Sequence, residues 1–299
     1  MKKGILFIIV SGLCFMVVNF FVKILGTSNA ISDDFGLQQY GAHELVFFRS
    51  LISLVLTAYL LKRKGLSFWG NNKKWLLVRG FAGVSALCIF FFTLQNLPLA
   101  VASIVQYLSP IFTILLAIAF LKERIFKWQW LFISLAFCGV IMMGIPSIIN
   151  RSEGQVSLMW LGLGVLSSFF AAIAYLAIIK LKETDTPLNI VLYFPLVSLP
   201  IMGVWCLFDF VMPVSWEWLI LLVIGIFTQF AQILMTKALH CAEPGVVVPF
   251  KYLGAFYAFT IGFFVFDEEL NLILYIALTT IIISVISNAI YKNKMKMNL

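Results

Sequence analysis

Polar side chains recur at helical spacing inside long apolar stretches of this sequence. Residues three or four apart lie on one face of a helix, so each set would form a narrow polar stripe on an apolar cylinder. The sets are Ser103, Gln106, Pro110 and Thr113; Gly225, Gln229, Gln232 and Thr236; Ser11, Phe15, Asn19 and Lys23; and Ser168, Ala172 and Tyr175. Such a stripe either bonds a neighbouring helix or lines a cavity. We interpret Asn19, Gln106, Gln229 and Gln232 as substrate-binding residues, because a side-chain amide requires several partners, and Tyr175 as a further one. Most of the Ser and Thr residues are interpreted as contacts between helices.

Three basic residues, Arg49, Arg79 and Lys251, lie well inside apolar stretches, whereas no acidic residue lies near the middle of one. A buried positive charge of this kind would attract an anionic or zwitterionic ligand carrying a carboxylate or phosphate. Structural alternatives stay open for all three. Lys251 and Arg79 could extend to the lipid headgroups, and Arg49 could pair with Glu44 or cap the carbonyl groups of a neighbouring helix.

The composition excludes a soluble fold. Hydrophobic residues make up 62% of the 299 positions and charged residues only 11%, against about a quarter in soluble domains. Five scattered cysteines and two distant histidines form no metal-type spacing, so we expect no metal and no cofactor. The net charge of +8 is attributed to membrane topology and lipid headgroups, not to nucleic acid.

Ten apolar runs are each long enough to cross a bilayer, which takes about 20 residues. They cover 4–26, 43–61, 74–95, 99–121, 128–149, 158–181, 190–210, 218–240, 244–266 and 270–290. With the N-terminus inside, cytoplasmic positions hold 16 basic residues and the outer loops hold only Arg151. The positive-inside rule then predicts an all-α membrane protein with ten transmembrane helices and both termini in the cytoplasm.

The chain also shows an internal repeat. The stretch from Gln95 to Glu123 has the same layout as the stretch from His240 to Glu269, 145 positions later. Five helices per half is an odd number, so the second half (150–299) is expected to be inverted relative to the first (1–149), as in many secondary transporters. The offset places Gln106 and Tyr107 opposite Lys251 and Tyr252, each pair about 10 Å deep at 1.5 Å per residue. We interpret these four residues as a ligand clamp.

Several motifs resemble one transporter family. FFRS at Phe47–Ser50, LVRG at Leu77–Gly80, and LPLAVASIVQYLSPIFT followed by LKER at 97–113 and 121–124 together look like the EamA family of the drug/metabolite transporter superfamily. The second half departs from the family pattern, with Ala255 at the place of Pro110 and with Asp267-Glu268-Glu269. The resemblance implies two inverted five-helix repeats and a carrier in the bacterial inner membrane. Within the family, the FFRS and RG signatures look closer to carriers of nucleotide-like or vitamin-like metabolites, such as S-adenosylmethionine and riboflavin, than to aromatic amino-acid exporters.

Other function classes fit poorly. An intramembrane enzyme requires paired carboxylates, a Ser–His pair or HExxH within the spans, and the sequence has none of these. A channel would require a filter-like repeat, which is also missing. We therefore expect a secondary transporter of small anionic or zwitterionic metabolites, amino-acid-like or nucleotide- and vitamin-like, that works by alternating access. The alternative is a multidrug or aromatic amino-acid exporter of the same fold. The expected partners are the substrate and membrane lipid, with homodimerisation left open.

The predicted topology can be checked by labelling in intact cells. Cysteine variants Lys64→Cys and Lys182→Cys, made after removal of the native cysteines, should resist a membrane-impermeant thiol reagent because both positions face the cytoplasm. Asp33→Cys and Asn150→Cys should react. Labelling of the Lys64→Cys variant in sealed cells would overturn the topology.

Overall fold

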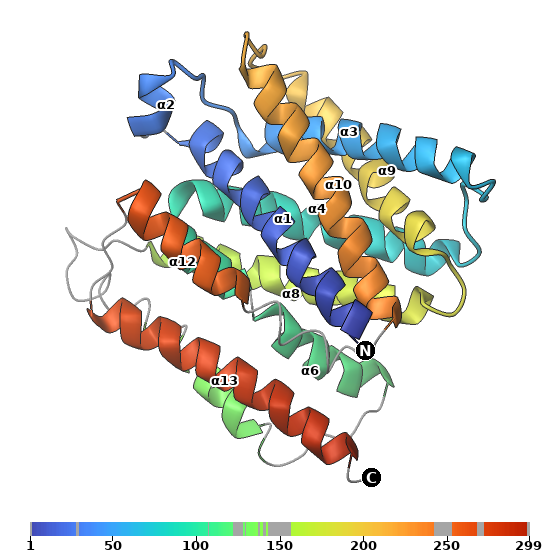
Figure 1. The fold of residues 1–299 in the computed structure, drawn as a ribbon, viewed down its shortest axis with the longest axis vertical. Helices are drawn as coiled ribbons and strands as arrows, with labels where there is room; N and C mark the ends of the chain where they lie inside the picture. The colour runs from blue at the N-terminus through green and yellow to red at the C-terminus, as the bar shows by residue number, and fades with distance from the viewer. Residues whose placement is uncertain are drawn as a thin grey trace.

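The computed structural model describes residues 2–27, 30–106, 108–121, 128, 130–136, 138–139, 142, 157–241, 253–267 and 272–297, and its regular elements there are all helices. They are α1 (Lys2–Gly26), α2 (Ala30–Asp34), α3 (Ala42–Arg63), α4 (Lys73–Asn96), α5 (Leu99–Gln106), α6 (Ser109–Leu121), α8 (Leu158–Leu181), α9 (Pro187–Cys206), α10 (Glu217–Cys241), α12 (Leu253–Val265) and α13 (Leu272–Met297). Figure 1 shows α1 beside α10, with α3 and α9 together on one flank of the bundle and α13 on the other.

Six helices of the described part are long and apolar enough to cross a membrane: α1, α3, α4, α8, α9 and α10. Their bounds agree with six of the predicted runs to within a few residues. Half of the run 128–149 and all of 244–252 in the run 244–266 lie outside the described residues. The total of ten spans and the cytoplasmic position of both termini therefore stay predictions.

The run predicted as one helix over 99–121 is interrupted. Helix α5 ends at Gln106 and α6 begins at Ser109. Pro110 accounts for the break, because proline has no N–H to bond the carbonyl of residue 106 and its ring would clash with that carbonyl in a continuous helix. Helix α5 is described as far as Gln106, one of the predicted site residues, and Leu108 lies in a turn before α6.

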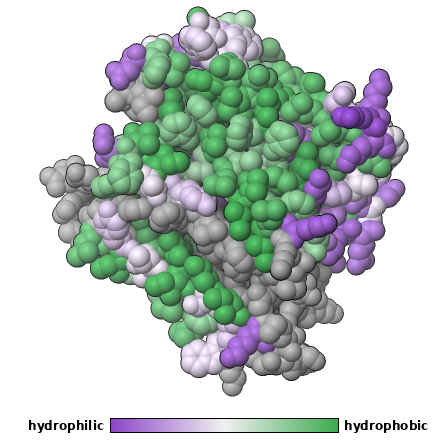
Figure 2. Space-filling view, in the orientation of Figure 1, coloured by the Kyte–Doolittle hydropathy of each residue, from purple (hydrophilic) through white to green (hydrophobic). Residues whose placement is uncertain are grey.

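The described surface is apolar and much of the polar side-chain chemistry is inside. Large hydrophobic side chains such as Leu6, Val55 and Phe230 are more than half exposed, whereas Arg49 and Gln229 are almost completely buried. Figure 2 shows a broad hydrophobic face, with hydrophilic residues gathered at the edge where Figure 1 places the α3–α4 and α8–α9 connections. A bundle surrounded by hydrocarbon has this distribution, because only its interior can satisfy polar groups.

Two hydrogen bonds between helices are related by the predicted repeat. The Ser11 hydroxyl on α1 donates to the carbonyl of Ala231 on α10, and the Ser167 hydroxyl on α8 donates to the carbonyl of Ala86 on α4, both at 2.7 Å. Ala86 and Ala231 are 145 positions apart, the offset of the repeat. Equivalent helices in two equivalent halves predict such a pair of bonds. The division at residue 149 and the inverted orientation of the halves stay predictions.

Two close contacts between helices at glycines show the same relation. A Cβ atom at Gly80 on α4 would lie 2.7 Å from Val197 on α9, and one at Gly225 on α10 would lie 2.5 Å from Ile52 on α3. Both members of the second pair are again offset by 145 from the first. Glycine is required at both places because the facing helix occupies the space of a side chain, as in many membrane helix interfaces.

At each end of this helix group, a carboxylate accepts hydrogen bonds from a segment that connects two helices. At one end, Glu217 accepts hydrogen bonds from the Tyr40 hydroxyl at 2.5 Å and from the Gln38 backbone at 2.6 Å. At the other end, Asp185 accepts from the backbone of Asn71 at 2.5 Å and of Asn72 at 3.2 Å.

The hydrogen bond between Tyr40 and Glu217 involves a neutral phenol. Burial, together with the hydrogen bond to Glu217, raises the pKa of the Tyr40 phenol above its usual range, so this hydroxyl stays a donor at physiological pH. The pair Tyr40–Glu217 is related to the pair Asp185–Asn72 by the 145-residue offset. The framework is therefore held in equivalent ways at its two ends.

The two glycine contacts can be tested by alanine substitution. Gly80→Ala and Gly225→Ala should each reduce the free energy of unfolding by about 1–3 kcal/mol, because the added methyl group overpacks the contact. Gly162→Ala is the matched control, since a Cβ there meets no atom within 4 Å. Thermal denaturation in detergent measures the effect, and unchanged melting of both variants would contradict the packing described.

Candidate functional site

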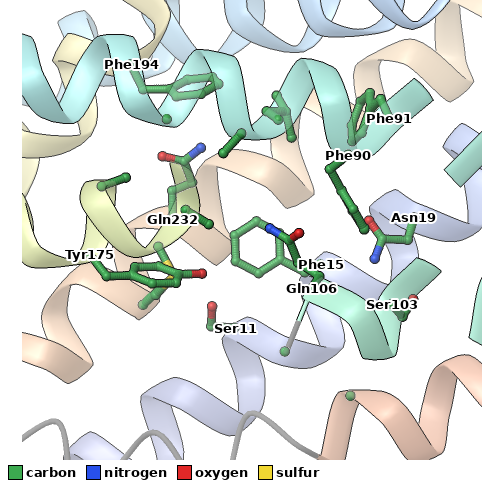
Figure 3. Close-up of a pocket in the computed structure, with 18 of the residues that line it drawn as sticks. Ser11, Phe15, Asn19, Phe90, Phe91, Ser103, Gln106, Tyr175, Phe194 and Gln232 are labelled. Atoms are coloured by element: carbon green, nitrogen blue, oxygen red, sulfur yellow. The ribbon is translucent and has the colours of Figure 1, made fainter. Parts of the chain in front are cut away.

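A cavity of about 160 Å³ lies in the middle of the bundle. Figure 3 shows Phe15 of α1, Gln106 of α5 and Tyr175 of α8 converging on one space. Other helices complete the wall. The polar residues that line the cavity are Ser11, Asn19, Arg49, Arg79, Ser103, Gln106, Tyr175 and Gln232, and the aromatic ones besides Tyr175 are Phe15, Phe90, Phe91 and Phe194.

The positive charge of this cavity comes from Arg49 on α3 and Arg79 on α4. Their side chains are 1% and 4% exposed, respectively. Both guanidinium groups lie against the same ring, with the guanidinium carbon 5.3 Å from the Phe194 centroid for Arg49 and 5.8 Å for Arg79. Arg49 also lies 5.5 Å from the Phe91 centroid. Contact with aromatic faces partly compensates the loss of water around each cation.

Neither arginine has a hydrogen-bond partner for every one of its buried donors. Arg79 Nη2 donates to Gln232 Oε1 at 3.3 Å. The Nε atoms of Arg49 and Arg79 are buried without a hydrogen-bond partner among the described residues. A buried donor without a partner costs about 1–3 kcal/mol, and more when the group is charged. A ligand oxygen that accepts from these atoms would recover that free energy.

No residue lining the cavity in the described part of the chain is acidic. Glu44, which the sequence offered as a partner for Arg49, instead accepts hydrogen bonds from the backbone of Gly41 and Val211. Arg79 lies in the cavity wall and does not extend to the membrane surface. The structure therefore does not show two of the structural alternatives, the ion pair of Arg49 with Glu44 and the headgroup contact of Arg79. The third, capping of backbone carbonyl groups by Arg49, stays a prediction.

Four of the predicted amide and tyrosine positions meet at the cavity. Asn19, Gln106, Tyr175 and Gln232 all line it, from four different helices (Figure 3). Gln106 is partly engaged, because its Oε1 accepts a hydrogen bond from Ser167 at 3.1 Å. These four side chains therefore present polar groups to the same space as the arginines.

Gln229 is placed elsewhere. Its Oε1 accepts from the Ser53 hydroxyl at 2.5 Å and its Nε2 donates to the Thr57 hydroxyl at 2.7 Å, both on α3. It does not appear among the cavity-lining residues and acts as a contact between α10 and α3. The predicted clamp residues Tyr107, Lys251 and Tyr252 lie outside the described residues.

Sequence reasoning missed the phenylalanines of the cavity wall. Phe90, Phe91 and Phe194 are three of 30 phenylalanines, and nothing in their spacing distinguishes them from residues packed against lipid. Gly83 also lines the cavity. The single available signal was that Gly83 follows Arg79 by four residues, one helical turn away on the same face.

An apolar helical bundle that encloses a charged cavity is the architecture of a membrane transporter. The chain belongs to the EamA-like transporter family, whose model matches residues 2–145 and 158–289, and thus to the drug/metabolite transporter superfamily. It is a multi-pass integral membrane protein, and this confirms the resemblance found in the sequence.

Individual relatives support the same class. The chain is similar to a protein named pseudopaline exporter CntI of Pseudomonas aeruginosa, with 32% identity over 85% of this chain and 84% of the relative. It is also similar to the S-adenosylmethionine uptake transporter of Rickettsia prowazekii, with 22% identity over 86% and 85% of the two chains. A crystal structure with 15% identity shares the fold, with a TM-score of 0.68 over 99% of both chains.

The assignment of Gln229 can be tested separately from ligand binding. Gln229→Leu should lower the free energy of unfolding by about 1 kcal/mol, because Ser53 and Thr57 lose their partner inside the membrane. Gln39→Leu, at an exposed position, is the control and should leave stability unchanged. Thermal denaturation and transport are measured on the same preparations. Loss of transport with unchanged stability would place Gln229 in the cavity instead.

Proposed function

We propose that this protein carries small anionic or zwitterionic metabolites across the bacterial inner membrane by alternating access. The observation that carries the proposal is the pair of buried arginines, Arg49 and Arg79, in a cavity with no acidic lining residue in the described part of the chain. A buried charge without a counter-charge is strongly unfavourable. This is why a protein loses much stability when one partner of a buried ion pair is removed. A bound carboxylate or phosphate would supply the missing charge.

The residues that line the cavity narrow the class of substrate further. Aromatic side chains surround the arginines, so a planar or apolar portion of a ligand could pack against Phe15, Phe90 or Tyr175. Amide groups of Asn19 and Gln106 add donors and acceptors for the remaining polar atoms. This combination suits amino-acid-like and nucleotide- or vitamin-like compounds. The two named relatives include one exporter and one uptake transporter, so they support transport of metabolites without favouring a direction.

A second candidate is an aromatic amino-acid or multidrug exporter of the same fold. The aromatic lining favours an aromatic amino acid, whose carboxylate an arginine could also bind. A permanently cationic drug is disfavoured, because it would enter a cavity that already holds two guanidinium groups. The two candidates therefore differ in the response to ligand charge.

Transport by purified protein in proteoliposomes tests the proposal. Matched pairs of ligands separate charge from shape: nicotinate with nicotinamide, and riboflavin 5′-phosphate with riboflavin. Uptake of at least one anion should exceed that of its neutral partner. Arg49→Gln and Arg79→Gln should each reduce this uptake about tenfold or more, the usual effect of losing a hydrogen bond to a charged group.

Two controls make the result specific. Lys180→Gln removes an exposed positive charge on α8, so it should leave uptake unchanged. Quaternary ammonium dyes are tested under a pH gradient. Robust gradient-driven efflux of these cations, with no transport of any anion in the panel, would defeat the proposal and favour a multidrug exporter.

A further inference from the structure

Gly83 on α4 lies directly beneath the guanidinium group of Arg79. A Cβ atom added at Gly83 would lie 2.2 Å from Arg79 Nη1 and 3.0 Å from Cδ2 of Phe194. The first distance is far below van der Waals contact. The guanidinium therefore occupies space that is free only because residue 83 has no side chain.

The backbone does not explain a glycine at this position. Gly83 is in the interior of a regular helix, and its φ is not in the left-handed region that favours glycine. Glycine is the poorest helix former after proline. The steric contact with Arg79 supplies the missing reason, because alanine or any larger residue would displace the guanidinium from the slot between Gly83 and Phe194.

The slot fixes an otherwise adaptable side chain. Arginine has several rotatable bonds, but here Nη1 lies against Gly83, Nη2 bonds Gln232 Oε1 at 3.3 Å, and the guanidinium carbon lies over the Phe194 ring. Nε is left buried and without a partner among the described residues, in the wall of the cavity. A planar acceptor such as a carboxylate matches the fork of donors that arginine presents.

We propose that Gly83 is a positioning residue for anion binding: it keeps open the slot that holds Arg79, and so sets the affinity of the cavity for a ligand carboxylate. This inference rests on the proposed function, since it assumes that Arg79 binds the anionic group. It goes beyond that function because it makes Gly83, which has no polar side chain, responsible for the position of the Arg79 guanidinium. The competing interpretation is that Gly83 only allows α4 to pack against Phe194.

The chain offers a matched control for the substitution. Gly12 on α1 lines the same cavity, and a Cβ there would meet no atom within 4 Å. Gly12→Ala therefore adds a methyl group to the cavity without displacing Arg79. Any effect of Gly83→Ala that exceeds the effect of Gly12→Ala is therefore due to displacement of the Arg79 guanidinium, not to the loss of cavity volume.

Binding to the full-length protein in detergent is measured by isothermal titration calorimetry, with nicotinate as the anionic probe and nicotinamide as its neutral match. Gly83→Ala should weaken nicotinate binding about tenfold, while nicotinamide binding changes less than about twofold. Gly12→Ala measures the effect of one added methyl group in the cavity, and the loss of nicotinate binding in Gly83→Ala should clearly exceed that effect. In an Arg79→Gln background, Gly83→Ala should cause no further loss, because the two substitutions act on the same contact.

The outcomes separate the two proposals. Nicotinate binding that survives Gly83→Ala, or an equal loss for both ligands, or the same loss in the Arg79→Gln background, overturns the positioning role. Wild-type protein without a preference for nicotinate, or Arg79→Gln protein that binds it normally, overturns the proposed function itself. If Gly83→Ala does not fold, the Arg79→Gln, Gly83→Ala protein should fold, because the methyl group then has room. Failure of both to fold assigns Gly83 to packing against Phe194.

Discussion

Hydrocarbon cannot hydrogen-bond to a protein, so every polar group within the membrane must find its partner inside the bundle. The serine and glutamine contacts between helices satisfy this constraint pairwise, as in Ser11 with Ala231 and Gln229 with Ser53 and Thr57. Among the described residues, the cavity is the place where the constraint is left unmet for charged groups, although the hydroxyl groups of Thr228 and Thr236, which do not line the cavity, also lack a hydrogen-bond partner. Arg49 and Arg79 keep buried donors without partners among the described residues. In the function proposed above, the transported ligand is the partner that completes these two groups.

The framework repeats along the chain but the cavity chemistry does not. Contacts that hold the helices together recur at the 145-residue offset, as in the Gly80–Val197 and Gly225–Ile52 pairs. At the same offset, Arg79 corresponds to Ile224. Likewise Arg49 corresponds to Phe194, the residue against which both guanidinium groups lie. Packing is thus shared between the two halves, whereas the positive charge of the described cavity comes from the first half alone.

Helix positions could be predicted well because a span requires about 20 apolar residues, and such runs are visible for α1, α3, α4, α8, α9 and α10. Spacing also predicted that Asn19, Gln106, Tyr175 and Gln232 share one region, and all four line the cavity. Their role in binding substrate stays a prediction. Spacing failed to separate Gln229 from Gln232. These residues differ by only about 60° around the helix axis, since each residue adds about 100°. That small angle turns one side chain toward α3 and the other into the cavity.

The arginines illustrate a different limit. Their depth along the chain could be counted, but depth does not tell whether a long side chain points to the membrane surface, to Glu44 or inward. That choice depends on the helices packed opposite, which come from the other half of the sequence. The slot at Gly83 was equally hidden, because it exists only when Phe194 of α9 is placed beside α4.

The origin of both arginines in one half has a kinetic consequence. In an alternating-access carrier with two equivalent halves, the outward-open and inward-open forms would be mirror images in function, with equal half-saturation concentrations on the two sides. Because the charge of the described cavity comes from the first half alone, a ligand approaching from one side meets the arginines in a different order from a ligand approaching from the other. The two half-saturation concentrations need not match. At equal concentrations on the two sides, such a carrier gives net movement only while another gradient drives the cycle. The asymmetry would appear when substrate is present on one side only, as different half-saturation concentrations for net influx and net efflux.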